Sequence, residues 1–309
     1  MKLVFLVYDS RSGSTLLSRE IAAQFPDAYV SPEIRFDALF GRPAAWWRHA
    51  GDGRVRQLLE AGRVPQKLEL PDSDIERMSS KARAIRPLIE DLVAGAAARE
   101  GRREPAVAVI KSGRHLRAAR RILAEIPEAQ FVFVVRDPRA AIGSKLVTDR
   151  PYVPGQKMAW AGPFAAALQW QWYGRLARQL ARAAPIHAVR YEALLADPVG
   201  VLEALAQFLS IPRALGGVRY RVPEAERAIH GRVLAEGLDA SRAAAWRAAL
   251  SVEDQTVIEI LCGSEMRRWG YEAELRPGLL RALALVVKSF LVSTARIARE
   301  AAARLAGSR

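Results

Sequence analysis

The sequence predicts an α/β protein in which a parallel β-sheet is sandwiched by helices and an amphipathic helix extends the C-terminal end. Short runs that are apolar throughout alternate with longer segments in which apolar residues recur at helical spacing. Runs of this kind are typical of parallel strands, because helices cover both faces of such a sheet. The length of 309 residues is enough for one large domain with its own core.

The predicted elements follow one another without an internal repeat. The expected strands cover residues 2–8, 28–31, 106–111, 130–135 and 186–190. The expected helices cover residues 14–25, 74–99, 114–125, 139–148, 164–183 and 198–209. We predict one domain over residues 1–276, with a helical and loop insertion at about 36–100 and a lid-like loop at about 149–163.

Charge and composition limit the ligands that the protein could bind. The chain carries 47 Lys and Arg against 33 Asp and Glu, and this net charge of +14 suits an anionic ligand or surface. A general bias toward arginine is the alternative explanation. No basic block interleaves with aromatic residues, so we expect no nucleic-acid partner. One cysteine and four scattered histidines exclude a disulfide within the chain and predict no metal site.

The two ends of the chain bear on its location. The apolar run at residues 2–8 is too short for a signal peptide, so we expect a cytoplasmic protein. Residues 277–309 predict a basic amphipathic helix, in which Arg281 and Lys288 interrupt the apolar residues and argue against a membrane span. This helix could pack on the body, associate with a second copy, or lie peripherally at the inner face of a membrane.

A turn of small residues follows the first predicted strand. Its residues Arg11, Ser12, Gly13, Ser14, Thr15 and Leu16 lead directly into the first helix. Such a turn aims backbone N–H groups at one place, where the helix dipole adds partial positive charge, and this arrangement binds phosphate. The lysine of the pattern GxxxxGK[ST] is missing, so this P-loop-like turn indicates a phosphate group bound without Mg²⁺. The alternative is an ordinary strand–turn–helix junction.

A second candidate anion site follows the strand at residues 130–135. Arg136 stands at the carboxyl end of this buried strand, where a side chain can reach a ligand above the sheet. Ser144 comes eight residues later and projects from the following helix. Arginine supplies forked donors and charge, so the two residues predict a phosphate clamp. The alternative is an ion pair between Arg136 and Asp137 at the start of the helix.

Together, residues 10–15 and 131–144 resemble the sulfotransferase family that uses 3′-phosphoadenosine 5′-phosphosulfate (PAPS). The first segment is similar to the family's 5′-phosphosulfate loop, in the arginine-containing form of the carbohydrate and bacterial branch. The second is similar to its 3′-phosphate motif, which implies that Arg136 and Ser144 hold the 3′-phosphate. The resemblance extends from about residue 2 to residue 271. It implies PAPS as cofactor, 3′,5′-adenosine bisphosphate (PAP) as product, and no metal.

Two further segments are similar to parts of the same family. Residues 190–198 resemble the stretch after the last parallel strand, and this implies that Tyr191 lies near the nucleotide. Residues 258–271 look like the family's closing helix. The Arg-Lys-Gly element of cytosolic members has no clean counterpart, and Arg242 is the nearest candidate to replace it.

The resemblance implies in-line transfer of a sulfuryl group to an acceptor hydroxyl, with Arg11 neutralising charge on the leaving phosphate. A general base must accept the hydroxyl proton. Glu33 is the first candidate, because the carbohydrate and tyrosine branches place a glutamate in a similar position; the alternative is a surface pair with Arg35. His115 is the second candidate, two residues later than the base histidine of cytosolic relatives. Lys111 could reach the sulfuryl group or the acceptor.

The expected acceptor is a hydroxyl of a carbohydrate or glycolipid. The arginine-type loop belongs to that branch, and Trp46, Trp47 and Trp160 could stack on sugar rings. Two other classes of function stay open. One is a P-loop kinase-like phosphotransferase, against which the missing lysine argues. The other is a non-catalytic nucleotide-binding or membrane-tethering protein with the same fold.

Overall fold

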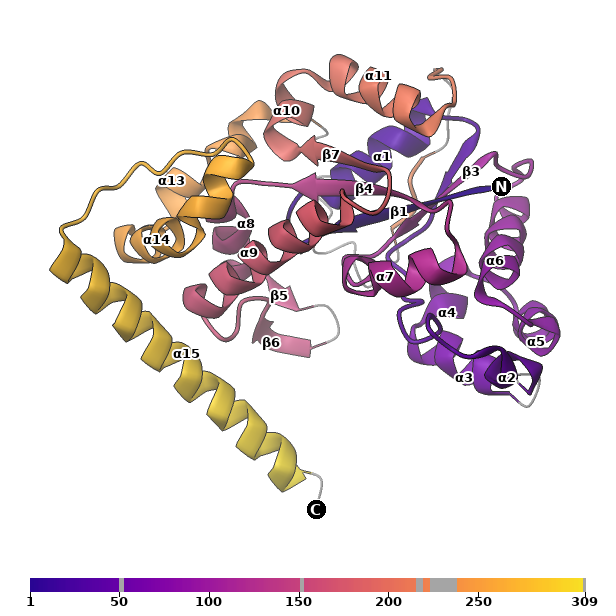
Figure 1. The fold of residues 1–309 in the computed structure, drawn as a ribbon, viewed down its shortest axis with the longest axis horizontal. Helices are drawn as coiled ribbons and strands as arrows, with labels where there is room; N and C mark the ends of the chain where they lie inside the picture. Colours follow the sequence, from indigo (N-terminus) through magenta and orange to yellow (C-terminus); the bar gives the residue numbers. More distant parts are fainter. Residues whose placement is uncertain (50–52, 151–152, 215–218, 223–237, 308–309) are drawn as a thin grey trace.

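The computed structural model describes residues 1–49, 53–150, 153–214, 219–222 and 238–307 (Figure 1). In this part of the chain, five parallel strands form the central sheet in the order β2-β3-β1-β4-β7. The strands are β1 (Lys2–Tyr8), β2 (Ala28–Val30), β3 (Val107–Lys111), β4 (Gln130–Val135) and β7 (Ile186–Arg190). Helices flank the sheet, so the predicted fold class is confirmed.

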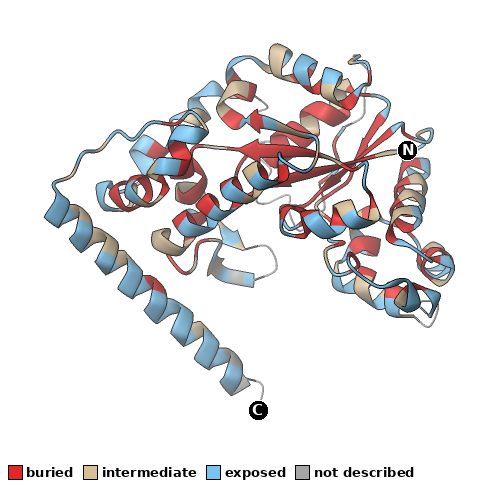
Figure 2. Cartoon of the chain, in the orientation of Figure 1, coloured by how far each residue is buried: buried red, intermediate tan, exposed pale blue. Residues whose placement is uncertain are grey.

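The two faces of the sheet carry separate cores (Figure 2). Side chains alternate along β1, so Phe5 and Val7 enter one core while Leu6 and Tyr8 enter the other. The Phe5 side is covered by α6 (Ile85–Arg99), α7 (His115–Glu125), α8 (Pro138–Val147), α9 (Pro163–Leu180) and α14 (Val252–Arg268). The Leu6 side is covered by α1 (Ser14–Gln24), α10 (Tyr191–Ala196) and α11 (Pro198–Leu209). Burial on both faces explains why the strands are apolar throughout.

The parallel register brings the carboxyl ends of the strands to one edge. Leu6 of β1 is level with Lys111 of β3, and Tyr8 is level with Val134 of β4. The segments that follow β1, β2, β3, β4 and β7 therefore leave the sheet side by side. In open α/β sheets this edge is where ligands bind.

The predicted insertion is helical over most of its described length. It comprises α2 (Ala44–Arg48), α3 (Arg54–Ala61), α4 (Val64–Leu68), α5 (Asp72–Lys81) and α6. The expected single helix at 74–99 is two helices, because Pro87 has no N–H and its ring clashes with the preceding turn, which restricts it to the first turn of α6. Residues 50–52 of the insertion lie outside the described residues.

The predicted lid-like loop contains a short hairpin. Its strands β5 (Asp149–Arg150) and β6 (Val153–Lys157) pair antiparallel, and the Met158 N–H donates to the Thr148 carbonyl at 2.8 Å. Pairing satisfies backbone groups that an irregular loop would leave to water. Residues 151–152 of this loop lie outside the described part.

The C-terminal part begins with η2 (Ala240–Ala243) and α13 (Trp246–Ala249), which precede α14. The last helix, α15 (Leu279–Gly307), contacts α9 and α14 along one side and continues beyond them (Figure 1). This agrees with the expected helix at 277–309, of which residues 308–309 lie outside the described residues.

His115 occupies the core at the start of α7. Its ring is completely buried, it packs against Phe5, Phe36 and Phe40, and its Nε2 accepts the Phe36 N–H at 3.2 Å. This bond holds the first residues of the insertion against the sheet. Burial lowers the pKa of His115 to about 4, because the charged form would lose its hydration.

We predict that His115 makes the protein less stable in mild acid. Between about pH 6.5 and pH 4 the unfolded chain binds a proton at this position that the folded chain does not, so the free energy of unfolding falls as the pH falls. From pH 7 to pH 4.5 the contribution is about 2–3 kcal/mol. Urea unfolding measures it: His115→Gln, which keeps an acceptor, should remove this part of the pH dependence. The exposed-site control His49→Gln should not, and equal slopes for all three proteins would contradict the prediction.

Candidate functional site

The turn between β1 and α1 has the backbone geometry of an anion site. Gly13 adopts φ 93° and α1 begins at the next residue without a side-chain cap. Arg11 also has a positive φ, of 68°. The N–H groups in the first turn of a helix have no acceptor within the helix, so they are available to a ligand, and the dipole favours an anion there.

The ring of Tyr191 covers this turn. A Cβ atom added to Gly13 would lie 2.2 Å from Cδ2 of Tyr191, so a larger residue cannot occupy the position without displacing the ring. Glycine is required here both by this close approach and by the positive φ. The structure therefore brings Tyr191 to the loop.

The two predicted anion sites meet. Nε of Arg11 donates to Oγ of Ser144 at 2.9 Å, and Nη1 of Arg136 donates to the Arg11 carbonyl at 3.3 Å. These contacts join residues that are more than a hundred positions apart in the sequence. The loop after β1 and the clamp after β4 thus form one continuous site at the carboxyl edge of the sheet.

Positive charge is concentrated in this site. Nη2 of Arg136 donates to the Arg242 carbonyl at 3.0 Å, and its guanidinium carbon lies 4.2 Å from the centroid of the Tyr191 ring. Burial and the neighbouring Arg136 lower the pKa of Arg11 to about 10. In the described part of the chain, neither Arg11 nor Arg136 forms an ion pair with a carboxylate. An arrangement of this kind binds an anion that supplies the missing charge.

Two buried polar atoms fit the same interpretation. Oγ of Ser12 and Nε of Arg136 are buried and have no hydrogen-bond partner among the described residues. Buried polar groups are nearly always paired, so a buried atom without a partner calls for an explanation. Both atoms belong to the predicted anion sites. A ligand with anionic groups at two points would satisfy them.

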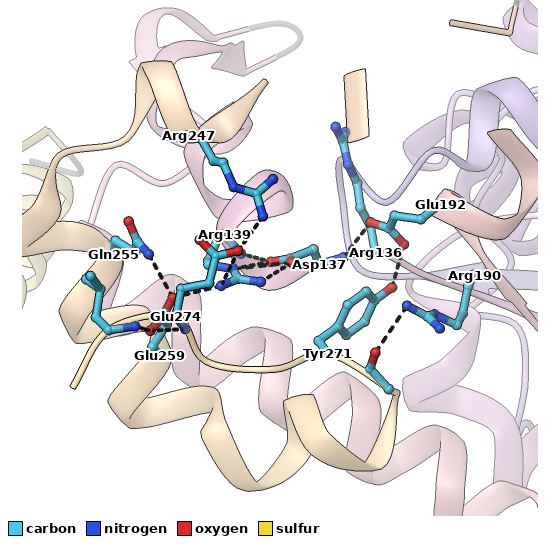
Figure 3. A network of polar contacts seen from close by, with 12 residues as sticks. Arg136, Asp137, Arg139, Arg190, Glu192, Arg247, Gln255, Glu259, Tyr271 and Glu274 are labelled. Carbon is cyan, nitrogen blue, oxygen red and sulfur yellow. Dashed lines mark hydrogen bonds and ion pairs between the residues drawn. The ribbon is translucent and has the colours of Figure 1, made fainter. Parts of the chain in front are cut away.

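A network of ion pairs fixes the backbone beside Arg136 (Figure 3). Nη2 of Arg139 contacts Oδ2 of Asp137 at 2.6 Å, and its Nη1 contacts Oε1 of Glu259 at 2.8 Å. The Asp137 N–H donates to Oε1 of Glu192 at 3.0 Å, and Glu192 Oε2 accepts from the Tyr271 hydroxyl at 2.7 Å. Asp137 thus pairs with Arg139, so the alternative pairing of Asp137 with Arg136 is absent.

Sequence reasoning missed a second buried ion pair beneath the loop. Lys145 and Asp9 are both buried and their charged groups are in contact. Nε2 of Gln169 donates to the other carboxylate oxygen of Asp9 at 2.6 Å. This pair links the start of the loop to the helix that carries Ser144. The available signal was that Asp9 directly follows a buried strand and Lys145 directly follows Ser144.

Lys111 also lies at the loop. Its side chain is buried, and its Nζ donates to Oγ1 of Thr15 at 3.0 Å and to the Tyr220 hydroxyl at 3.3 Å. The Tyr220 hydroxyl in turn donates to the Ser31 carbonyl at 3.2 Å. Lys111 is therefore held between the turn after β1 and the segment after β2.

Glu33 lies in this same segment, beside Tyr8. Burial, and then the carboxylate of Glu33, raise the pKa of Tyr8 well above its ordinary value. Arg35 pairs with Asp37, not with Glu33, with Nε and Oδ1 at 3.4 Å. The structure thus places Glu33 near the end of β1, with a half-buried side chain.

The remaining predicted residues are placed differently. His115 is enclosed in the core described above, and the structure does not bring it to the loop. Trp47 is buried in the same core, and Trp46 packs edge-to-face against it with ring centroids 5.0 Å apart. Tyr8 and Tyr220 were missed, because an aromatic residue at a strand end or in a loop gives no signal that distinguishes a site from a core.

Comparisons with known proteins bear on the family and on the fold. A family model described as the sulfotransferase family matches residues 4–214. Among solved structures, the sulfotransferase domain of the Synechococcus PCC 7002 olefin synthase is 21% identical with a TM-score of 0.60, covering 88% of this chain and 95% of that one. The sulfotransferase domain of the curacin biosynthetic pathway is 19% identical with a TM-score of 0.54, covering 88% and 98%.

A mouse sulfotransferase complexed with PAP is 15% identical with a TM-score of 0.44, covering 86% of this chain and 85% of that one. A comparison with curated proteins found no match. At these identities the structural neighbours show the fold, and the family model carries the assignment. Because that model spans more than half of its length, the chain belongs to the sulfotransferase family.

Proposed function

We propose that the protein transfers a sulfuryl group from PAPS to a hydroxyl of a carbohydrate or glycolipid. The observation that carries this proposal is the contact between Arg11 and Ser144, with Arg136 beside them and without a carboxylate on either arginine. One site with two anion-binding parts suits one ligand that carries a phosphosulfate and a separate phosphate.

Each part of the site takes one end of the nucleotide in this proposal. The phosphosulfate is bound by the turn, through residues Arg11, Ser12, Gly13, Ser14, Thr15 and Leu16. Arg136 and Ser144 bind the 3′-phosphate, and Arg242, whose carbonyl already contacts Arg136, closes that side. Tyr191 lies against both the turn and Arg136, between the two ends.

The transfer is an in-line displacement at sulfur. A bond forms between the acceptor oxygen and sulfur, the bond from sulfur to the 5′-phosphate oxygen breaks, and PAP leaves with that electron pair. Arg11 and the N–H groups of the turn stabilise the charge that grows on the leaving oxygen. In this proposal Lys111, whose Nζ donates to Oγ1 of Thr15, stabilises the sulfuryl oxygens. The proton of the acceptor hydroxyl passes to a base on the protein.

Glu33 is the base in this proposal. It is half-buried at the ligand-binding edge, Tyr8 lies next to its carboxylate, and Arg35 is engaged elsewhere. His115 is a weaker choice, because its ring is completely buried and its Nε2 already accepts a backbone N–H. A general base must come within hydrogen-bond reach of the acceptor.

The acceptor class rests on the arginine-type loop and on the aromatic residues that stay accessible. Trp47 no longer supports it, because its ring is part of the core. Trp46 and Trp160 are half-buried and remain available to stack on a sugar ring. The carbohydrate or glycolipid assignment therefore depends on fewer residues than the sequence indicated.

We predict that PAP stabilises the protein against heat and that MgATP does not. A ligand at a hundred times its Kd adds about 2.7 kcal/mol to the free energy of unfolding. Arg11→Gln and Arg136→Gln should each remove most of the shift in Tm, whereas the exposed-surface control Arg120→Gln should retain it. Stabilisation by MgATP alone would favour the kinase-like alternative.

Labelled sulfate tests the acceptor class. We expect [³⁵S]PAPS to label a glycan or glycolipid in extracts of the native host when the wild-type protein is added, and glycosidase treatment should release the label. Arg11→Gln is the inactive control. Labelling of a hydroxylated lipid that carries no sugar would contradict the acceptor assignment and preserve the transferase. No labelling, together with normal PAP binding, would favour the non-catalytic alternative.

On the acceptor so identified, we expect Glu33→Gln to lower kcat by about 10²–10⁴ while the PAP-induced shift in Tm is unchanged. The matched control is Asp37→Asn, a carboxylate four residues away that pairs with Arg35 and Arg114. Loss of kcat in folded His115→Gln, with activity retained in Glu33→Gln, would transfer the role of base to His115.

A further inference from the structure

The helix α15 has an apolar surface that the body of the protein does not cover. This surface, the apolar arc, consists of Leu279, Leu280, Leu283, Val287, Phe290, Leu291, Ile297 and Leu305. At 100° per residue these positions fall within one sector of the helix, about a third of its circumference. All eight are exposed, Leu279 at 83% and Leu280 at 84%, and Figure 2 colours most of the helix as exposed.

A different side of α15 holds it against the body. Ser293 is buried and lies against Gly162 at the start of α9, Arg296 Nη1 donates to the Trp160 carbonyl at 3.5 Å, and Gln156 Nε2 donates to Oε2 of Glu300 at 3.4 Å. These contacts are made by small and polar residues. The attachment to the body therefore leaves most of the apolar arc to another partner, although Phe290 also touches Phe164.

Basic side chains border the apolar arc. Arg281, Lys288 and Arg299 are exposed and lie at 180–200° on the same helical projection, next to the end of the arc at Leu291. Lys288 also pairs with Glu253 at 2.9 Å. An exposed apolar sector flanked by Lys and Arg is the pattern of helices that lie in the interface of a bilayer.

The charge of the basic border favours a lipid surface over a second copy of the chain as the partner of the apolar arc. Apposing two apolar arcs would also bring two basic borders together, in a chain whose net charge is already +14. An anionic bilayer supplies the opposite charge instead. No helix in the described part of the chain is long and apolar enough to cross a membrane, so the helix would lie in the interface plane.

We propose that α15 docks the protein on the surface of an anionic lipid bilayer, with its apolar arc at the boundary between headgroups and acyl chains. Apolar burial and attraction of the basic border contribute together. The proposal stands apart from the transfer reaction, because it uses no residue of the candidate site.

Vesicle flotation with the full chain tests it. We expect wild-type protein to float with vesicles of phosphatidylglycerol and phosphatidylcholine in equal parts, and not with pure phosphatidylcholine. The triple variant Leu283→Gln, Val287→Gln, Leu291→Gln should lower partitioning at least a hundredfold. The double variant Arg281→Gln, Arg299→Gln should lower it about tenfold to thirtyfold, since a basic group near such a surface contributes roughly a fivefold factor.

Matched controls separate the arc from general surface properties. Val147, Val199 and Val252 are exposed on the body, so changing all three to Gln removes the same number of apolar groups elsewhere. Arg99→Gln with Arg120→Gln removes the same charge. Both controls should float like the wild type. Equal loss of flotation in the controls would overturn the proposal. It would also be overturned if the wild-type protein does not bind vesicles and light scattering shows a dimer that the triple substitution converts to a monomer.

Discussion

The site depends on keeping two arginines close together without a carboxylate between them. Burial and the neighbouring charge of Arg136 lower the pKa of Arg11, because the two guanidinium groups repel each other where little water solvates them. Hydrogen bonds to neutral oxygens hold the two side chains in this arrangement. Their guanidinium N–H groups donate to the Ser144 hydroxyl and to two backbone carbonyls. A dianionic ligand would relieve the repulsion, so the same contacts that orient the arginines leave their charge available for binding.

Arg139 illustrates the opposite arrangement three residues later. It is buried, yet Asp137 and Glu259 compensate its charge, with Glu274 at the margin. A buried ion pair of this kind contributes little net stability but is costly to break, so it serves to hold geometry. Because Asp137 is bonded to Arg139 and to Glu192, the backbone next to Arg136 cannot shift without breaking several charged contacts. Arg139, whose charge is paired, thus helps to position Arg136, whose charge is not.

The sequence was sufficient to predict the sheet, because strands buried on both faces are apolar throughout. It was also sufficient to predict the turn after β1, because small residues around Gly13 between a strand and a helix indicate such a turn. The joint action of Arg136 and Ser144 stays a prediction: Ser144 accepts a hydrogen bond from Arg11, and Arg136 donates to the Arg11 carbonyl. The sequence was not sufficient to separate two uses of the same residue type. Trp47 is a core residue, and His115 is a core histidine that accepts a backbone bond, although either side chain could equally have lined a ligand site. Tyr8 gave no signal, since its contacts join elements that only the fold brings together.

The basic residues of the chain lie in several different surroundings in the fold, so no single ligand accounts for all of the positive charge. Arg11 and Arg136 concentrate it at the turn after β1, where they lie together without a carboxylate partner among the described residues. Arg281, Lys288 and Arg299 distribute it along an exposed helix beside an apolar surface, which suits an extended anionic layer and not a single phosphate. A third group of arginines forms ion pairs with carboxylates of the protein itself, as Arg139, Arg178 and Arg56 do. The basic residues of the chain are therefore found in three different arrangements, of which the pairs with carboxylates add nothing to the net charge of +14.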